Sequence, residues 1–289
     1  MTEEFVFNGM YCKKWISDSE TAVIQIIHGL GEMSEYYEQF AECVNGKGIS
    51  VYLAEMRYHG RTRLAVDVDD LLDVMADESI ALTEKIHETH STPIILLGHS
   101  MGAYIAQLML KKRGELYSGA VLTGCACFEN IPALQAAIDK EIAEKGADAP
   151  CMEVFMQVFG RVAKRFPEKC TVSWVTSDLE RAEYYEKLPY TNVMYSNRFY
   201  KSFIDTAAKI QDEQFPMSIE HKCPVFIACG ADDSVGGYGA YPPTRAEDYK
   251  NAGFDVKLKV YENMRHSVLQ EKRRDIVTED IMDFVHGIV

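Results

Sequence analysis

The segment 98–102, with the sequence Gly-His-Ser-Met-Gly, constrains the fold of this chain more than any other. It follows the apolar run 93–97, and a helical pattern begins directly after it, near Ala103. A buried strand, a tight turn that carries a serine and a following helix form the arrangement called a nucleophile elbow. The flanking glycines fit it, because a side chain two positions from the serine would collide with the facing strand or helix. The pattern predicts Ser100 as a nucleophilic hydroxyl held at the mouth of a cleft.

Strand-like and helix-like segments alternate along most of the chain. Apolar or β-branched runs bounded by turn residues predict buried strands over 21–27, 49–54, 93–97, 118–123, 224–230 and 256–261. Helical spacing predicts helices over about 36–45 and 67–90, from 103 to Gly114, from Thr244 with a capping box, and from Thr278. The start of the chain reads as a hairpin with Asn8-Gly9 at its turn. This alternation predicts an α/β fold with a doubly wound, mostly parallel sheet.

Residues 126–220 interrupt the alternation. The segment is helical in pattern, and large apolar residues at helical spacing form one stripe: Met152, Phe155, Phe159, Val162 and Phe166. Such a stripe more often packs in a core than contacts a ligand. Its position between two strands of the sheet nevertheless favours a segment that covers the cleft of Ser100. We therefore expect a core of residues 1–125 and 221–289 with a helical lid inserted at 126–220.

Composition limits the partners and the compartment. The chain of 289 residues has a formal net charge of −14, which argues against binding nucleic acid. Its N-terminus lacks the pattern of a secretory signal, and no apolar run reaches the length of a transmembrane helix. Eight cysteines are scattered along the chain, and Cys125-Ala126-Cys127 is too closely spaced for a usual zinc pair. We expect reduced thiols and a cytoplasmic location.

A serine hydroxyl needs a histidine to take its proton and an anion to orient that histidine. In a doubly wound sheet these partners lie on loops at the carboxyl ends of later strands. Asp232 and Asp233 follow the strand 224–230, and His266 follows the strand 256–261. Two backbone N–H groups must also face the developing oxyanion, and Leu30 and Met101 are best placed to supply them. The other histidines fit structural roles at turns, strand ends and helix ends: His28, His59, His87, His90, His99, His221 and His286.

These motifs together resemble the α/β-hydrolase superfamily, and within it the monoacylglycerol lipase and lysophospholipase branch, which is also called serine aminopeptidase-like. The resemblance rests on segments 28–32 (His-Gly-Leu-Gly-Glu), 98–102, 230–235 (Gly-Ala-Asp-Asp-Ser-Val) and 265–266 (Arg-His). The branch usually has G-x-x-D-P-V in its acid loop, which puts Asp233 at the triad acid and Ser234 where proline is common. The turn 55–62 and Ala103 depart from the usual sequence. The resemblance implies an α/β-hydrolase fold that needs no metal or organic cofactor.

The resemblance also implies hydrolysis of a carboxylic ester with one acyl chain. The expected substrate is a small-molecule ester with an apolar acyl group, such as a monoacylglycerol, a lysophospholipid or a small ester. One alternative is an aminopeptidase or amide hydrolase on the same triad, with lid carboxylates such as Glu180, Glu183 and Glu186 holding a substrate ammonium. Another is a catalytically silent scaffold. Such scaffolds usually lose a triad member, whereas this chain retains candidates for all three.

Overall fold

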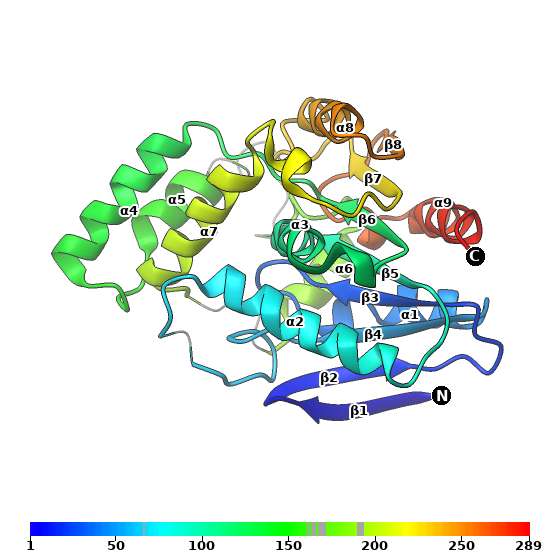
Figure 1. Cartoon of the computed structure of the whole chain (residues 1–289). Coiled ribbons are helices and arrows are strands. Elements are labelled where there is room, and N and C mark those ends of the chain that lie inside the picture. The colour runs from blue at the N-terminus through cyan, green and yellow to red at the C-terminus, as the bar shows by residue number, and fades with distance from the viewer. Residues whose placement is uncertain (66, 161, 163–165, 167–171, 190–193) are drawn as a thin grey trace.

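An eight-stranded sheet forms the centre of the computed structural model, which describes residues 1–65, 67–160, 162, 166, 172–189 and 194–289 (Figure 1). The strand order is β1-β2-β4-β3-β5-β6-β7-β8. All pairs from β4 to β8 are parallel, and only β1–β2 and β2–β4 are antiparallel. The strands are β1 (Thr2–Phe7), β2 (Met10–Trp15), β3 (Ala22–Ile27), β4 (Ile49–Ala54), β5 (Ile94–His99), β6 (Gly119–Thr123), β7 (Val225–Gly230) and β8 (Val256–Tyr261). The predicted mostly parallel sheet is confirmed.

The first two strands form the predicted hairpin. Asn8 and Gly9 join them, with φ values of 48° and 83°. A two-residue turn with positive φ at both positions matches the right-handed twist of its strands, and asparagine followed by glycine adopts it at low cost.

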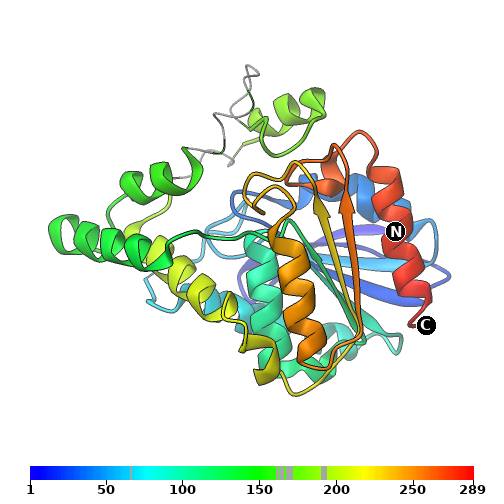
Figure 2. The ribbon, with the colours of Figure 1, turned by 90° about the horizontal axis from the view of Figure 1, so that it is seen from above.

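Helices cover both faces of the sheet (Figure 2). Helices α1 (Glu38–Asn45) and α9 (Arg274–His286) pack on one face, and α2 (Leu71–His87), α3 (Met101–Arg113) and α8 (Tyr241–Asn251) pack on the other. Side chains of a strand alternate between the faces. In β3, accordingly, Ile24 and Ile26 join the core under α1 and α9, and Val23 and Ile27 join the core under α2 and α3.

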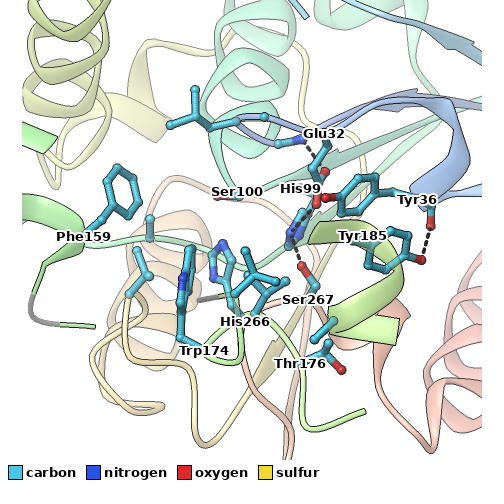
Figure 3. A pocket seen from close by; sticks show the side chains of 18 of the residues that line it. Glu32, Tyr36, His99, Ser100, Phe159, Trp174, Thr176, Tyr185, His266 and Ser267 are labelled. Atoms are coloured by element: carbon cyan, nitrogen blue, oxygen red, sulfur yellow. Dashed lines mark hydrogen bonds and ion pairs between the residues drawn. The ribbon is translucent and has the colours of Figure 1, made fainter. Parts of the chain in front are cut away.

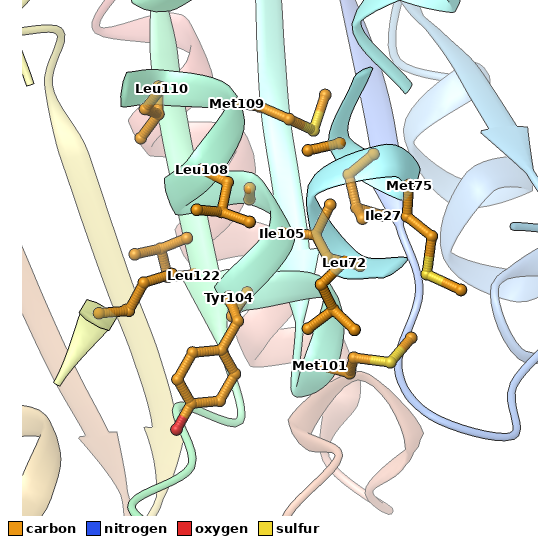
Figure 4. Close-up of a cluster of buried hydrophobic side chains, with 14 of the residues drawn as sticks. Ile27, Leu72, Met75, Met101, Tyr104, Ile105, Leu108, Met109, Leu110 and Leu122 are labelled. Atoms are coloured by element: carbon orange, nitrogen blue, oxygen red, sulfur yellow. The ribbon is translucent and has the colours of Figure 1, made fainter. Parts of the chain in front are cut away.

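The helix after the elbow is held by packing along its whole length. Met101, Ile105 and Met109 are buried, and Figure 4 shows α3 facing Leu72 and Met75 of α2 across this cluster. Full burial of one such side chain contributes about 1.5–3 kcal/mol. The start of α3, and with it Ser100, is therefore held in a fixed place at the end of β5.

The chain between β6 and β7, which we call the β6–β7 segment (residues 126–220), carries α4 (Ile131–Lys145), α5 (Met152–Phe159), α6 (Leu179–Glu186) and α7 (Asn197–Ile210). Figure 1 shows α4, α5 and α7 side by side beyond the sheet. Ser202 of α7 accepts a hydrogen bond from the N–H of Leu72 at 3.0 Å, which ties the segment to α2. Short 3₁₀ turns lie at η1 (Ser34–Tyr36), η2 (Gly114–Leu116), η4 (Phe215–Ser218) and η5 (Val268–Gln270).

Three predicted helix starts were wrong. Helix α8 begins at Tyr241 rather than Thr244, because Pro242 suits a first turn, where the missing N–H has no carbonyl to bond. Helix α9 begins at Arg274 rather than Thr278, and α2 begins at Leu71, with Asp70 just before its first turn. No helix in the described part of the chain has the length and apolarity needed to cross a bilayer.

Candidate active site

Ser100 lies at a strained turn between β5 and α3. Its backbone has φ 53° and ψ −119°, outside the regions that side-chain-bearing residues prefer. Positions 98 and 102 require glycine, because a side chain there would collide with nearby backbone atoms. A Cβ on Gly102 would lie 2.0 Å from the carbonyl oxygen of Ile27, and one on Gly98 would lie 2.5 Å from the oxygen of Gly102. The elbow predicted from the sequence is therefore present.

His266 and Asp233 are bonded to each other and buried. Nδ1 of His266 lies 2.9 Å from Oδ2 of Asp233, and the two residues are 3% and 0% exposed. The other oxygen, Oδ1, accepts a hydrogen bond from the N–H of Val235 at 2.9 Å. The structure thus brings Asp233 to His266, and the neighbouring Asp232 has a different environment, with its N–H donating to the oxygen of Met264.

Burial and charge oppose each other at this pair. Burial alone would raise the pKa of Asp233, but the charge and hydrogen bond of His266 outweigh it and lower the pKa below its ordinary value. Burial alone would lower the pKa of His266, but the charge and hydrogen bond of Asp233 outweigh it and raise the pKa. Both shifts favour the imidazolium beside the carboxylate, which is the form a proton-accepting histidine must reach.

Ser100 and His266 line one cavity of about 260 Å³, which we call the first cavity (Figure 3). Among the described residues no hydrogen bond joins the Ser100 hydroxyl to His266. Such bonds are often long in substrate-free enzymes and tighten when substrate binds.

The loop after β3 borders the same cavity and carries Leu30. His28 holds this loop, since Nδ1 donates to the oxygen of Gly29 at 2.8 Å and Nε2 accepts from the N–H of Met56 at 2.9 Å. The N–H of Gly29 donates to Oε2 of Glu32 at 2.7 Å. Met101 opens α3, and the first N–H groups of a helix have no intrahelical acceptor. Leu30 thus lines the cavity that Ser100 lines, and Met101 directly follows Ser100 at the start of α3.

A buried polar cluster behind the site was not predicted. His99 Nε2 lies 2.8 Å from the hydroxyl of Ser267 and 3.6 Å from Oε1 of Glu32, and its Nδ1 lies 3.0 Å from the hydroxyl of Thr123. Burial lowers the pKa of His99 to about 4, so this imidazole stays neutral near pH 7. The cluster links the loops after β3 and β8 to the ends of β5 and β6. Only the position of His99 inside the elbow motif could have indicated it from the sequence.

Trp174 was also missed. Its ring lies 5.3 Å from the ring of His266, and Phe159 of α5 lies 5.9 Å from Trp174 on the other side. Phe155 and Phe159 line the first cavity, so part of the predicted apolar stripe faces the site rather than a core. Met152 is 50% exposed. No periodic signal marks Trp174, because it lies in an irregular stretch.

The first cavity has an apolar end and a polar end. Figure 3 shows Phe159 and Trp174 on one side of Ser100 and His266, with Glu32, Tyr36 and Tyr185 on the other. The rings of Tyr36 and Tyr185 stack at 3.9 Å. Tyr195 also lines the cavity, and its buried hydroxyl has no hydrogen-bond partner in the described part of the chain. Such a site suits a molecule with one apolar and one polar part.

Of the three carboxylates of the β6–β7 segment singled out in the sequence, Glu180, Glu183 and Glu186, only Glu186 lines the cavity. Glu180 and Glu183 are exposed, and Glu183 lies 3.8 Å from Lys187. His87 and His90 have separate partners, the oxygen of Leu116 and the carboxylate of Glu20. The described cysteines carry free thiols, and Cys170 lies outside the described residues.

A family model, described as serine aminopeptidase S33, matches residues 18–273. The chain belongs to this serine aminopeptidase S33 family. Relatives by sequence include a monoacylglycerol lipase from Mycolicibacterium smegmatis, 23% identical, with 94% of this chain and 90% of the relative aligned. The phospholipase YtpA of Bacillus subtilis is 24% identical, with 91% of this chain and 94% of the relative aligned.

Two solved structures match this chain over its full length. A thermostable carboxyl esterase from Bacillus coagulans has a TM-score of 0.91 at 23% identity, with 100% of this chain and 99% of that chain covered. A lipase in its open form has a TM-score of 0.89 at 25% identity, with the same coverage. The α/β-hydrolase fold expected from the motifs is confirmed, and the S33 chain is a serine hydrolase of the esterase and lipase type.

Proposed function

We propose that this enzyme hydrolyses carboxylic esters with an apolar acyl group through a Ser100–His266–Asp233 triad. The observation that carries the proposal is the buried hydrogen bond between His266 and Asp233 on the wall of the cavity that Ser100 enters. A histidine fixed in this way has the tautomer whose Nε2 accepts a proton from the serine.

In the proposed reaction the oxygen of Ser100 attacks the acyl carbonyl while His266 takes the serine proton. The N–H groups of Leu30 and Met101 stabilise the oxyanion, and each such donor is worth about 3–4 kcal/mol in the transition state. The C–O bond then breaks, and His266 gives its proton to the leaving alcohol. Water attacks the acyl-enzyme with the same histidine as base, which releases the acid and restores Ser100.

The two ends of the first cavity support the substrate class. The aromatic side chains of Phe159 and Trp174 suit the acyl chain, and the hydroxyl of Tyr195 and the carboxylate of Glu32 suit hydroxyl groups of the leaving alcohol. The helical β6–β7 segment supplies most of the apolar end, so we propose residues 126–220 as the lid over a core of residues 1–125 and 221–289. The proposed location remains the cytoplasm, from the sequence alone.

The test is hydrolysis of p-nitrophenyl esters from acetate to palmitate by the wild-type enzyme and by Ser100→Ala. We expect turnover in the wild type and none above background in the variant, with unchanged circular dichroism. A folded Ser100→Ala protein that retains activity would refute the triad.

Amide hydrolysis is the second candidate, favoured by the carboxylate of Glu186 on the cavity wall, which could attract a substrate ammonium. Aminoacyl p-nitroanilides measured beside the esters decide between the two. Amide hydrolysis would be established by a kcat/KM that is higher on the anilides than on the esters. Glu186→Gln should then reduce the value on the anilides, and the exposed control Glu183→Gln should not.

A further inference from the structure

A second cavity of about 500 Å³ lies beside the first. It opens between the β6–β7 segment and the loop after β7. Its apolar walls come from Leu134 of α4, Val158 of α5, Val162 and Tyr241 at the start of α8. Its polar lining includes the exposed residues Glu129 and Gln157, and the hydroxyl of Ser234, which is buried with no hydrogen-bond partner in the described part of the chain.

The two cavities share the residues Phe128 and Val235. The backbone of Phe128 is fixed by Gln211, which accepts from its N–H at 2.9 Å and donates to its oxygen at 3.1 Å. The backbone of Val235 is fixed between Asp233 and Cys127, each at 2.9 Å. Phe128 and Val235 therefore form the boundary that the two cavities share, and both have anchored backbones. Both side chains are buried, so a passage between the cavities requires these two side chains to rotate on backbones that stay in place.

Size indicates which molecule needs both cavities. Binding sites for small molecules usually measure about 300–1,000 Å³, and the first cavity falls below that range. The first cavity must also hold the leaving alcohol at its polar end, which leaves limited room for an acyl chain. The second cavity is the larger one and adjoins the apolar walls of the first.

From this shared boundary and these sizes we infer that the second cavity receives the distal methylenes of a long acyl chain bound to Ser100, past the side chains of Phe128 and Val235. The inference rests on the proposed function and extends it from apolar acyl groups in general to long unbranched ones. It predicts that blocking the second cavity affects long chains and spares short ones. Each methylene kept out of an apolar site changes kcat/KM by about fourfold.

The test is Val158→Trp, which fills the second cavity from a position that does not line the first. The control is Met156→Trp on the same helix, at a residue that is 54% exposed and lines neither cavity. Both are assayed on p-nitrophenyl butyrate and p-nitrophenyl palmitate in the same detergent micelles. We expect Val158→Trp to lower kcat/KM for palmitate at least tenfold and to change butyrate less than twofold, while Met156→Trp changes neither.

An unchanged palmitate rate in Val158→Trp overturns the inference, and so does an equal loss on both esters. Gln157→Trp, at the exposed rim, replaces Val158→Trp if that variant melts at a lower temperature than the wild type. Failure of the proposed function is separate, because it appears as loss of butyrate turnover in the wild type. In that case palmitic acid serves as the probe, and the melting temperature is measured with and without it. The inference requires palmitic acid to raise the melting temperature of the wild type more than that of Val158→Trp. Equal shifts in the two proteins overturn the inference.

Discussion

The imidazole of His266 is bonded to Asp233 at 2.9 Å, although Asp232, one residue earlier, carries the same carboxylate. The difference arises in the turn after β7. The N–H of Asp232 donates to the oxygen of Met264, whereas the Asp233 side chain turns inward and accepts from the N–H of Val235. The two residues therefore provide a matched pair of variants.

Asp233→Asn should lower kcat for p-nitrophenyl butyrate by roughly 10⁴-fold, because an amide stabilises neither the required tautomer nor the imidazolium. Asp232→Asn should stay within twofold of the wild type. Steady-state kinetics of both variants at pH 8 give the answer, with circular dichroism as the control for folding. Equal losses in the two variants would contradict the assignment of Asp233.

The pH dependence of activity follows from the raised pKa of His266. Only the neutral imidazole accepts the serine proton, so activity is lost as pH falls through the pKa of the folded enzyme. Asp233 holds that pKa above the ordinary value of 6.5 despite burial, so the midpoint of the kcat/KM profile should lie above pH 6.5. The residual activity of Asp233→Asn should show a lower midpoint, because burial then acts without the opposing charge. A wild-type midpoint below 6.5, or an unmoved one in the variant, would contradict this account.

Gly102→Ala should destabilise the fold. The added methyl would lie 2.0 Å from the oxygen of Ile27, a backbone atom of the central strand β3 that cannot rotate away. We expect the free energy of unfolding in urea to fall by at least about 2 kcal/mol. Gly46→Ala is the control, because its nearest neighbour would lie at 3.6 Å and its φ of −63° suits alanine. That variant should gain about 0.4–1 kcal/mol, and equal effects of the two would contradict the steric explanation.

Local chemistry explains which features the sequence predicts well. Buried parallel strands are continuous apolar runs, so β4 is located to the residue. The edge strand β8 is located to the residue by a different signal, because its apolar residues alternate with lysines. The elbow and the loops carrying Asp233 and His266 follow such strands directly, so their order along the chain predicts that they meet at one edge of the sheet. The choice between Asp232 and Asp233 needed the family resemblance, because spacing alone does not say which carboxylate turns inward.

Residues that act through tertiary contacts were beyond sequence reasoning. Trp174 contacts His266 only because residues 172–178 fold back onto the loop after β8, 92 positions further along the chain. Glu32, His99 and Ser267 come from the loop after β3, the end of β5 and the loop after β8, and they meet only in the assembled fold. The predicted start of α8 was wrong for a related reason. Tertiary packing and the prolines of α8 determine where the helix begins, rather than the capping pattern at Thr244.

Glu271 joins the loop of His266 to the β6–β7 segment, and its removal provides the last prediction. Its Oε1 accepts from the N–H groups of Arg265 at 2.7 Å and Ser177 at 2.9 Å, and its Oε2 accepts from the Ser177 hydroxyl. The residue is 1% exposed, and Glu271→Ala removes the acceptor of these half-buried donors, at a cost of about 1–3 kcal/mol in unfolding free energy.

The same variant should lower kcat roughly 10- to 100-fold, because Arg265 directly precedes His266 and small displacements of a reacting group are costly. Glu271→Gln should restore most of both losses, since its amide oxygen still accepts from the two N–H groups and its NH₂ can donate to the Ser177 hydroxyl. Glu262→Ala, at an exposed residue of the same loop, is the control and should be neutral. Urea unfolding and butyrate kinetics measure the two effects. A Glu271→Ala enzyme with reduced stability and full kcat would mean that this carboxylate supports the fold without positioning His266.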